Sequence, residues 1–188
     1  MKLAIFGGTF DPIHEAHLAV AREAAGRFHL ERVLFIPAAH PPHKAGATQA
    51  PYLDRLRMTE LACQSDPRFE ASALEAGALR SYSIDTIEKL RASLAPEDEL
   101  FFIVGADAFS DIRTWRRWRD VARSVRFVVV SRPGCVYDVP PETAVERLDT
   151  VEMAVSSSAI RAALARGVRP AAVPAGVLEY ILSHHLYT

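Results

Sequence analysis

Residues 3–17 read Leu3-Ala4-Ile5-Phe6-Gly7-Gly8-Thr9-Phe10-Asp11-Pro12-Ile13-His14-Glu15-Ala16-His17, a short apolar run that passes through two glycines toward a helix. Glycines leave no Cβ in the way of an approaching phosphate. His14 and His17 stand three residues apart and share one face of the first helical turn. The positive end of that helix points toward the same place. Strand, glycine turn and helix in this order are typical of a nucleotide-binding site.

The residue types alone leave three roles open for His14 and His17. Two imidazoles at a helix start can neutralise charge on a phosphate during its transfer. They can also chelate a metal, although a metal site usually has a third protein ligand and none is obvious nearby in the sequence. They can be surface histidines without a role. Their position after a Gly-Gly-Thr turn at a strand end favours the phosphate.

Length and composition bound the class of protein. The chain has 188 residues, of which 49% are hydrophobic, and we expect one domain over residues 1–188. A net charge of -1 argues against a general binder of nucleic acids or membrane surfaces, and no apolar run approaches membrane-spanning length. Cys63 and Cys135 lack a CxxC spacing, as expected of a reduced, cytoplasmic protein. A homo-oligomer remains open, because an apolar dimer patch looks like any apolar surface.

Strand and helix patterns alternate along the chain. Continuously apolar runs predict strands covered on both faces, at 2–6, 32–37, 69–71, 100–105 and 126–131, with a last strand around 147–151. Helices are predicted at 14–27, 53–64, 84–94, 115–122, from 156 and at 174–184. This alternation predicts an α/β fold with a doubly wound, mainly parallel, Rossmann-like sheet. A C-terminal helical segment is expected at about 156–188.

Several polar residues follow the predicted strands, where the carboxyl edge of such a sheet binds ligands. Asp107, after Gly105, can accept from a ribose hydroxyl, help to hold Mg²⁺ or cap the next helix. Lys44 can reach polyphosphate oxygens or be an exposed loop lysine without a role. The end of the strand at 126–131 carries Ser131 and Arg132.

Two further clusters have an ordinary and a functional interpretation. Residues Ser156-Ser157-Ser158 with Arg161 can be helix caps, or they can surround a terminal phosphate with hydroxyls, amides and a guanidinium. The run Trp115-Arg116-Arg117-Trp118-Arg119 can stack on nucleic-acid bases, but the neutral overall charge weakens that interpretation. A tryptophan near the sheet edge can equally stack on a single flat heterocycle, and burial in the core is the default interpretation for Trp118.

Residues 7–17 resemble the first signature of the HxGH-type nucleotidylyltransferases, and residues 156–161 resemble the second. Four further stretches resemble the bacterial nicotinate mononucleotide adenylyltransferases within that superfamily: 41–44, 81–86, 105–107 leading to 114–115, and 131–134. In order and spacing they cover nearly the whole chain.

This resemblance implies a reaction and its residues. ATP and nicotinate mononucleotide, with Mg²⁺, would give deamido-NAD and pyrophosphate by in-line attack on the α-phosphate, without a covalent intermediate. The implied catalytic residues are His14, His17 and Arg161, and the acceptor would meet Trp115 and the Tyr82-Ser83 turn. Mg²⁺ would be held through the ATP phosphates and by no protein cage, with Asp107 as the one candidate carboxylate. The implied ATP-binding residues are Gly7, Gly8, Thr9, Phe10, Lys44, Gly105, Asp107, Ser131, Arg132, Ser157 and Ser158.

The sequence departs from the family pattern at three positions. Ala16 replaces the usual glycine between the histidines, while Ser158 and Ser83 stand where threonine is common and keep the hydroxyl. Two alternatives to the implied function remain. One is a sister enzyme for another phosphorylated acceptor, such as phosphopantetheine or nicotinamide mononucleotide. The other is a non-catalytic nucleotide-binding regulator, against which the joint presence of His14, His17 and Arg161 argues.

Overall fold

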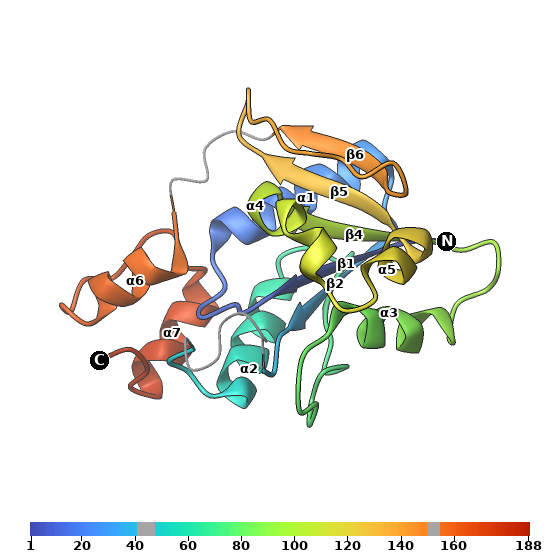
Figure 1. The fold of residues 1–188 in the computed structure, drawn as a ribbon. Helices are drawn as coiled ribbons and strands as arrows, with labels where there is room; N and C mark the ends of the chain where they lie inside the picture. The colour runs from blue at the N-terminus through green and yellow to red at the C-terminus, as the bar shows by residue number, and fades with distance from the viewer. Residues whose placement is uncertain (41–47, 150–154) are drawn as a thin grey trace.

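The fold is built on a six-stranded sheet in which every strand runs parallel to its neighbours, in the order β3-β2-β1-β4-β5-β6 (Figure 1). A computed structural model of the chain describes residues 1–40, 48–149 and 155–188. The strands are β1 (Lys2–Gly8), β2 (Arg32–Pro37), β3 (Phe69–Ala71), β4 (Glu99–Gly105), β5 (Arg126–Ser131) and β6 (Ala144–Asp149). The predicted doubly wound parallel sheet is therefore confirmed.

Helices cover both faces of the sheet, as the apolar strands require. They are α1 (Glu15–Phe28), α2 (Tyr52–Cys63), α3 (Ser83–Arg91), α4 (Ala106–Ser110), the 3-10 helix η1 (Ile112–Thr114), α5 (Trp118–Ser124), α6 (Ser157–Leu164) and α7 (Ala175–Ser183). Alternate residues of β1 point to opposite faces: Ala4 and Phe6 pack with α1, α2, α6 and α7, whereas Leu3 and Ile5 pack with α3, α4 and α5. The two cores thus share one thin sheet.

Two predicted elements begin at clearly different residues, and one short helix was not predicted. β6 begins at Ala144, before the predicted 147–151, and residues 150 and 151 lie outside the described part. Only Leu148 of this edge strand is buried, so its apolar signal is weak. The helix predicted over 115–122 begins at Trp118, because a 3-10 turn ends at Trp115. The five-residue α4 was not predicted, since it is too short to show a helical period.

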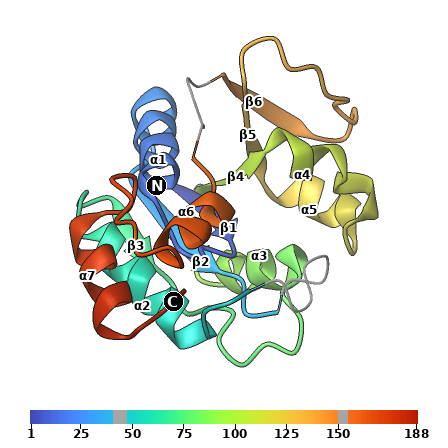
Figure 2. The same ribbon diagram turned by 90° about the vertical axis from the view of Figure 1, so that its left-hand side faces the viewer.

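The strand order reverses between β1 and β4, and in sheets of this type ligands bind at that point, beyond the carboxyl ends of the strands. In Figure 1, α6 and α7 lie on the side toward which the strand arrows point. Figure 2, viewed from that side, shows α6 in front of the sheet, with α2 and α7 on one side of it and α4 and α5 on the other. The C-terminal helices therefore stand beside the expected binding edge.

Candidate active site

The turn after β1 is held in shape by one aromatic ring. Phe10 has a left-handed backbone conformation, with φ of 47°, and its side chain is buried. A Cβ on Gly8 would lie 2.9 Å from this ring, so only glycine fits there without displacing it. The ring also meets Phe6 edge-on, with centroids 5.8 Å apart. Glycine at position 8 thus allows the backbone to lie close against the Phe10 ring.

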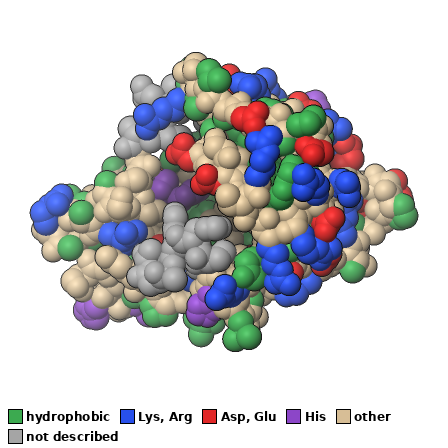
Figure 3. All heavy atoms as spheres, viewed as in Figure 1, with side chains coloured by type: hydrophobic (Ala, Val, Ile, Leu, Met, Phe, Trp, Pro, Cys, Tyr) green, Lys and Arg blue, Asp and Glu red, His purple; other side chains and the backbone are tan. Residues whose placement is uncertain are grey.

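The two histidines lie at the start of α1, in the geometry that the sequence predicts. His14 is the N-cap and is buried, and its ring stacks on that of His17 with centroids 3.8 Å apart. The backbone N–H of His14 donates to Nδ1 of His17 at 3.2 Å. Nδ1 of a neutral His17 must therefore accept, and the proton is carried by Nε2. His17 can thereby present an N–H donor to an anion at the helix start. In Figure 3, histidine side chains reach the surface near the middle of the view, at the edge of a hollow.

Burial keeps this pair neutral. It lowers the pKa of His14 to about 4 and lowers the pKa of His17 well below its ordinary value of 6.5, with a smaller contribution from His14. Nδ1 of His14 is buried without a hydrogen-bond partner among the described residues. An unpartnered buried polar atom of this kind is costly unless a ligand satisfies it.

The neutral histidines predict a pH-dependent stability. The unfolded chain binds protons at a pKa of about 6.5, whereas folded His14 does so at about 4, so the unfolded state takes up more protons between these values and stability falls as the pH decreases. At pH 5, His14 alone accounts for about 2 kcal/mol. Urea unfolding at pH 7 and pH 5 measures this loss, which should be about 2 kcal/mol smaller in His14→Asn. The exposed His29→Asn is the matched control, and equal losses in both variants would contradict the assignment.

The second motif docks directly on the first. The hydroxyl of Ser157 donates to the carbonyl oxygen of Pro12 at 3.0 Å, and Nη1 of Arg161 donates to that of Asp11 at 2.8 Å. Nε of Arg161 is buried without a partner among the described residues. Ser158 is exposed in the first turn of α6. The two predicted phosphate motifs, about 150 residues apart, are thus brought together.

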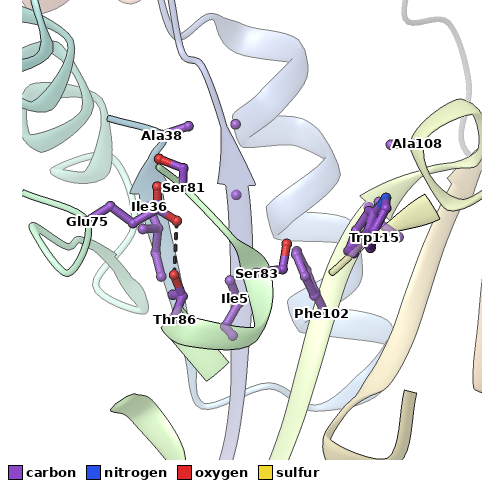
Figure 4. A pocket seen from close by; sticks show the side chains of 13 residues that line it. Ile5, Ile36, Ala38, Glu75, Ser81, Ser83, Thr86, Phe102, Ala108 and Trp115 are labelled. Atoms are coloured by element: carbon purple, nitrogen blue, oxygen red, sulfur yellow. Dashed lines mark hydrogen bonds between the residues drawn. The ribbon is translucent and has the colours of Figure 1, made fainter. Parts of the chain in front are cut away.

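A pocket of about 180 Å³ opens beside this loop (Figure 4). Ser83 and Trp115 line it, as do Gly7 and Gly8, the last two residues of β1. The Tyr82 side chain is not among the lining residues; its ring lies under the guanidinium of Arg116, 4.9 Å from the centroid. The other residues of the wall are Ile5, Ile36, Ala38, Glu75, Ser81, Thr86, Phe102, Val104 and Ala108.

Glu75 and Thr86 belong to the pocket wall but were missed by the sequence analysis. Oγ1 of Thr86 donates to Oε1 of Glu75 at 3.0 Å, and the N–H of Ala39 donates to Oε2 at 3.4 Å. Figure 4 shows this pair on the side of the pocket opposite Phe102 and Trp115. Glu75 lies in a stretch with no regular pattern, and nothing in the sequence distinguishes it from a surface carboxylate.

The remaining predicted residues that the structure describes lie at the same edge with fewer contacts. Gly105 is the N-cap of α4, so Asp107 lies in the first turn and is not the cap itself. Asp107 is exposed. Ser131, at the end of β5, donates its hydroxyl to Oδ1 of Asp149 at 2.7 Å, and Arg132 is exposed. Lys44 lies outside the described residues. Thr9 is half-buried, and its carbonyl oxygen accepts from Arg55.

Arg55 is a buried residue beside the site that was not predicted from the sequence. It is only 1% exposed, and it donates from Nη1 to the carbonyl oxygens of Thr9 and Ala38, at 2.7 and 2.8 Å, and from Nε to that of Ala50 at 3.2 Å. It connects the turn after β1 to Ala38 and Ala50, which lie on either side of residues 41–47. One signal was available: Arg55 shares a helical face with buried Met58 and Thr59, where an apolar residue is expected.

The described residues contain no group of three His, Cys, Asp or Glu side chains placed to hold a metal ion. Among the helices that the structure describes, none is both long and apolar enough to cross a membrane. Cys63 and Cys135 are free.

A parallel sheet with this strand order, a glycine turn and a helix start at its switch point defines a nucleotide-binding α/β protein. The cytidylyltransferase-like family model matches residues 5–163, and the chain belongs to this family, in its nicotinate-nucleotide adenylyltransferase branch. A protein of Solibacter usitatus named "Probable nicotinate-nucleotide adenylyltransferase" is 67% identical over 187 residues that span all of both chains. A protein of the same name from Thermus thermophilus is 44% identical over 190 residues, again spanning all of both.

Solved structures agree on the fold. The nicotinic acid mononucleotide adenylyltransferase of Plasmodium falciparum, complexed with NaAD, superposes with a TM-score of 0.79 at 18% identity. The match covers 99% of this chain and 97% of that chain. Its complex with APC superposes with a TM-score of 0.77.

Proposed function

We propose that the chain transfers the adenylyl group of ATP to nicotinate mononucleotide, giving deamido-NAD and pyrophosphate. One observation carries the proposal: Gly7 and Gly8, which end β1 and lead into the turn before the histidine pair, also belong to the wall of the pocket. A mononucleotide whose ring fills the pocket would therefore extend its phosphate toward a triphosphate held at the start of α1. The names of the close relatives support this choice of substrates.

The chemistry needs positioning more than proton transfer. An oxygen of the mononucleotide phosphate forms a bond to the α-phosphorus of ATP, the bond from that phosphorus to the bridging oxygen breaks, and pyrophosphate leaves. The nucleophile is already anionic, so no general base is required. Nε2–H of His17 and the helix start would stabilise charge on the transferred group. Arg161, Ser157 and Ser158 would bind the leaving phosphates.

We include Mg²⁺ in the proposal, as an ion that would bind together with ATP. Mg²⁺ keeps several waters and binds through substrate phosphates and one or two carboxylates. Asp107, exposed at the carboxyl edge of the sheet, is the carboxylate that would hold it, or it would bind the ribose. When bound, the ion neutralises phosphate charge.

The acceptor roles are distributed around the pocket. Trp115, whose ring centroid lies 5.8 Å from that of Phe102, would stack on the pyridine ring. Ser83 and the backbone of the Tyr82-Ser83 turn would meet the nicotinate carboxylate. ATP contacts would extend to Thr9, Phe10, Lys44, Gly105, Ser131 and Arg132. A cytoplasmic location and a single domain over residues 1–188 belong to the same proposal.

Pyrophosphate release with Mg-ATP tests the proposed reaction. Nicotinate mononucleotide should support release, and nicotinamide mononucleotide and phosphopantetheine should do so far less. Trp115→Ala should raise the KM for the pyridine substrate about tenfold and leave the KM for ATP within about twofold, since one stacked ring contributes about 1–3 kcal/mol. Trp118→Ala, a half-buried tryptophan outside the pocket wall, is the control. Release with none of the acceptors would favour the non-catalytic regulator.

A further inference from the structure

We propose that Tyr187, the penultimate residue, is a positioning residue for the ATP triphosphate, and that its hydroxyl acts by holding the carboxylate of Asp11 away from Arg161. The inference rests on the proposed use of ATP and adds a role for the C-terminal tail. It begins from the contacts of Asp11, which the mechanism above does not use.

Asp11 is buried, with 2% of its surface exposed, and lies inside the first motif between Thr9 and His14. Its Oδ1 accepts from the hydroxyl of Tyr187 at 2.7 Å and from the N–H of Ala50 at 3.1 Å. Its Oδ2 accepts from the N–H of Gln49 at 2.7 Å. Three donors from two distant segments thus fix the orientation of one buried carboxylate.

Arg161 lies on the other side of the same residue. Nη1 donates to the backbone carbonyl oxygen of Asp11 at 2.8 Å, but it remains 3.9 Å from the carboxylate oxygen Oδ2. A half-buried arginine and a buried aspartate this close would gain a charge-assisted hydrogen bond by closing the gap. Closing it would direct the guanidinium at Asp11 and take its charge from an incoming phosphate. The donors on the carboxylate oppose that closure.

Of these three donors, Tyr187 is the one that donates from its side chain, and its hydroxyl stays protonated. Burial raises the pKa of its hydroxyl, and so does the hydrogen bond to Asp11, so the phenol keeps its proton. The backbone of residues 185–187 places this hydroxyl beside Asp11. His185 and Tyr187 both have left-handed backbone conformations, with φ of 51° and 65°, and Leu186 between them packs against the core. Such conformations persist in non-glycine residues only where surrounding contacts hold them.

The variant Tyr187→Phe removes the hydroxyl and keeps the ring that packs on the core. We expect the Kd for Mg-ATP, measured by calorimetry without an acceptor, to rise about tenfold, because Asp11 then moves toward Arg161. In steady state, the KM for ATP should rise in parallel, with the KM for the pyridine mononucleotide unchanged. A purely structural loss would reduce the active fraction and leave both constants as they were.

Tyr180→Phe is the matched control. Tyr180 in α7 also donates its hydroxyl to an aspartate, Oδ1 of Asp54, at 2.8 Å, but Asp54 has no contact with the phosphate motifs among the hydrogen bonds of the described residues. It should change the Kd for ATP less than twofold, and the two variants should lose similar stability in urea. Deletion of residues 187 and 188 should weaken ATP binding at least as much as Tyr187→Phe.

Two results would overturn the inference: ATP binding by Tyr187→Phe within twofold of the unmodified chain, or an equal weakening in Tyr180→Phe. Because the binding measurement needs no acceptor, it gives the same answer whether or not nicotinate mononucleotide is the acceptor. Failure of the proposed reaction is seen instead in the pyrophosphate assay.

Discussion

Replacing His17 by alanine is expected to lower kcat by about 10²–10³-fold, the range found when one preorganised donor to a reacting centre is removed. Nδ1 of His17 is occupied by the N–H of His14, so Nε2–H is the atom that the side chain offers to a phosphate. The variant also loses its hydrogen bond at the helix start, which costs about 1 kcal/mol of stability. Pyrophosphate release at saturating ATP and acceptor measures the change in kcat.

The exposed His29→Asn serves as the control and should keep full activity. Circular dichroism and the Tm of both variants separate a lost donor from a lost fold. Near-normal turnover in a folded His17→Ala protein would remove His17 from the phosphate site.

The second large effect is expected on stability. Arg55→Leu leaves the carbonyl oxygens of Thr9, Ala38 and Ala50 without their donor in the interior. Each unsatisfied buried polar group costs about 1–3 kcal/mol, so the free energy of unfolding should fall by about 3–5 kcal/mol. Equilibrium urea unfolding at pH 7 measures it. Arg55→Lys should recover little, because a point charge cannot reproduce the fork that reaches three oxygens.

Arg57→Leu, two residues along the same helix, is the comparison. Arg57 forms an exposed ion pair with Glu60 at 2.8 Å, and such pairs contribute about 0–1 kcal/mol. Similar losses in Arg55→Leu and Arg57→Leu would show that the buried contacts of Arg55 add nothing beyond those of a surface arginine.

The fold could be predicted because its signals are local. Buried parallel strands are continuously apolar, and β1, β4 and β5 end in glycine or serine at the edge where ligands bind. The predicted bounds of β6 were wrong because an edge strand with one buried residue, Leu148, has few apolar positions. The short α4 and the 3-10 turn before Trp115 are shaped by packing against β4 and β5. A short stretch of sequence does not show such tertiary contacts.

The residues of the candidate site likewise fall into those with a local sequence signal and those without one. The histidine pair could be placed from spacing alone, since both residues belong to one helical turn. The contacts of Arg55 and Tyr187 could not be predicted, because Thr9 and Asp11 lie 46 and 176 residues away from them and accept through a backbone or carboxylate oxygen. The sequence offered for Arg55 only its position on an otherwise buried helical face. Glu75 enters the pocket through a loop whose course depends on β2 and α3. A residue that joins distant segments can interrupt a local pattern, but that pattern does not identify its partners.

The contact between Tyr187 and Asp11 joins two segments that lie 176 residues apart in the chain, and it bears on the order in which the site is completed. During synthesis the glycine turn and both histidines emerge first, whereas Arg161 and Tyr187 follow Asp11 by 150 and 176 residues. A nascent chain whose tail is still inside the ribosome can form β1 and α1 but lacks both groups that flank Asp11. We therefore expect the nucleotide site to be completed only after Tyr187 has emerged from the ribosome.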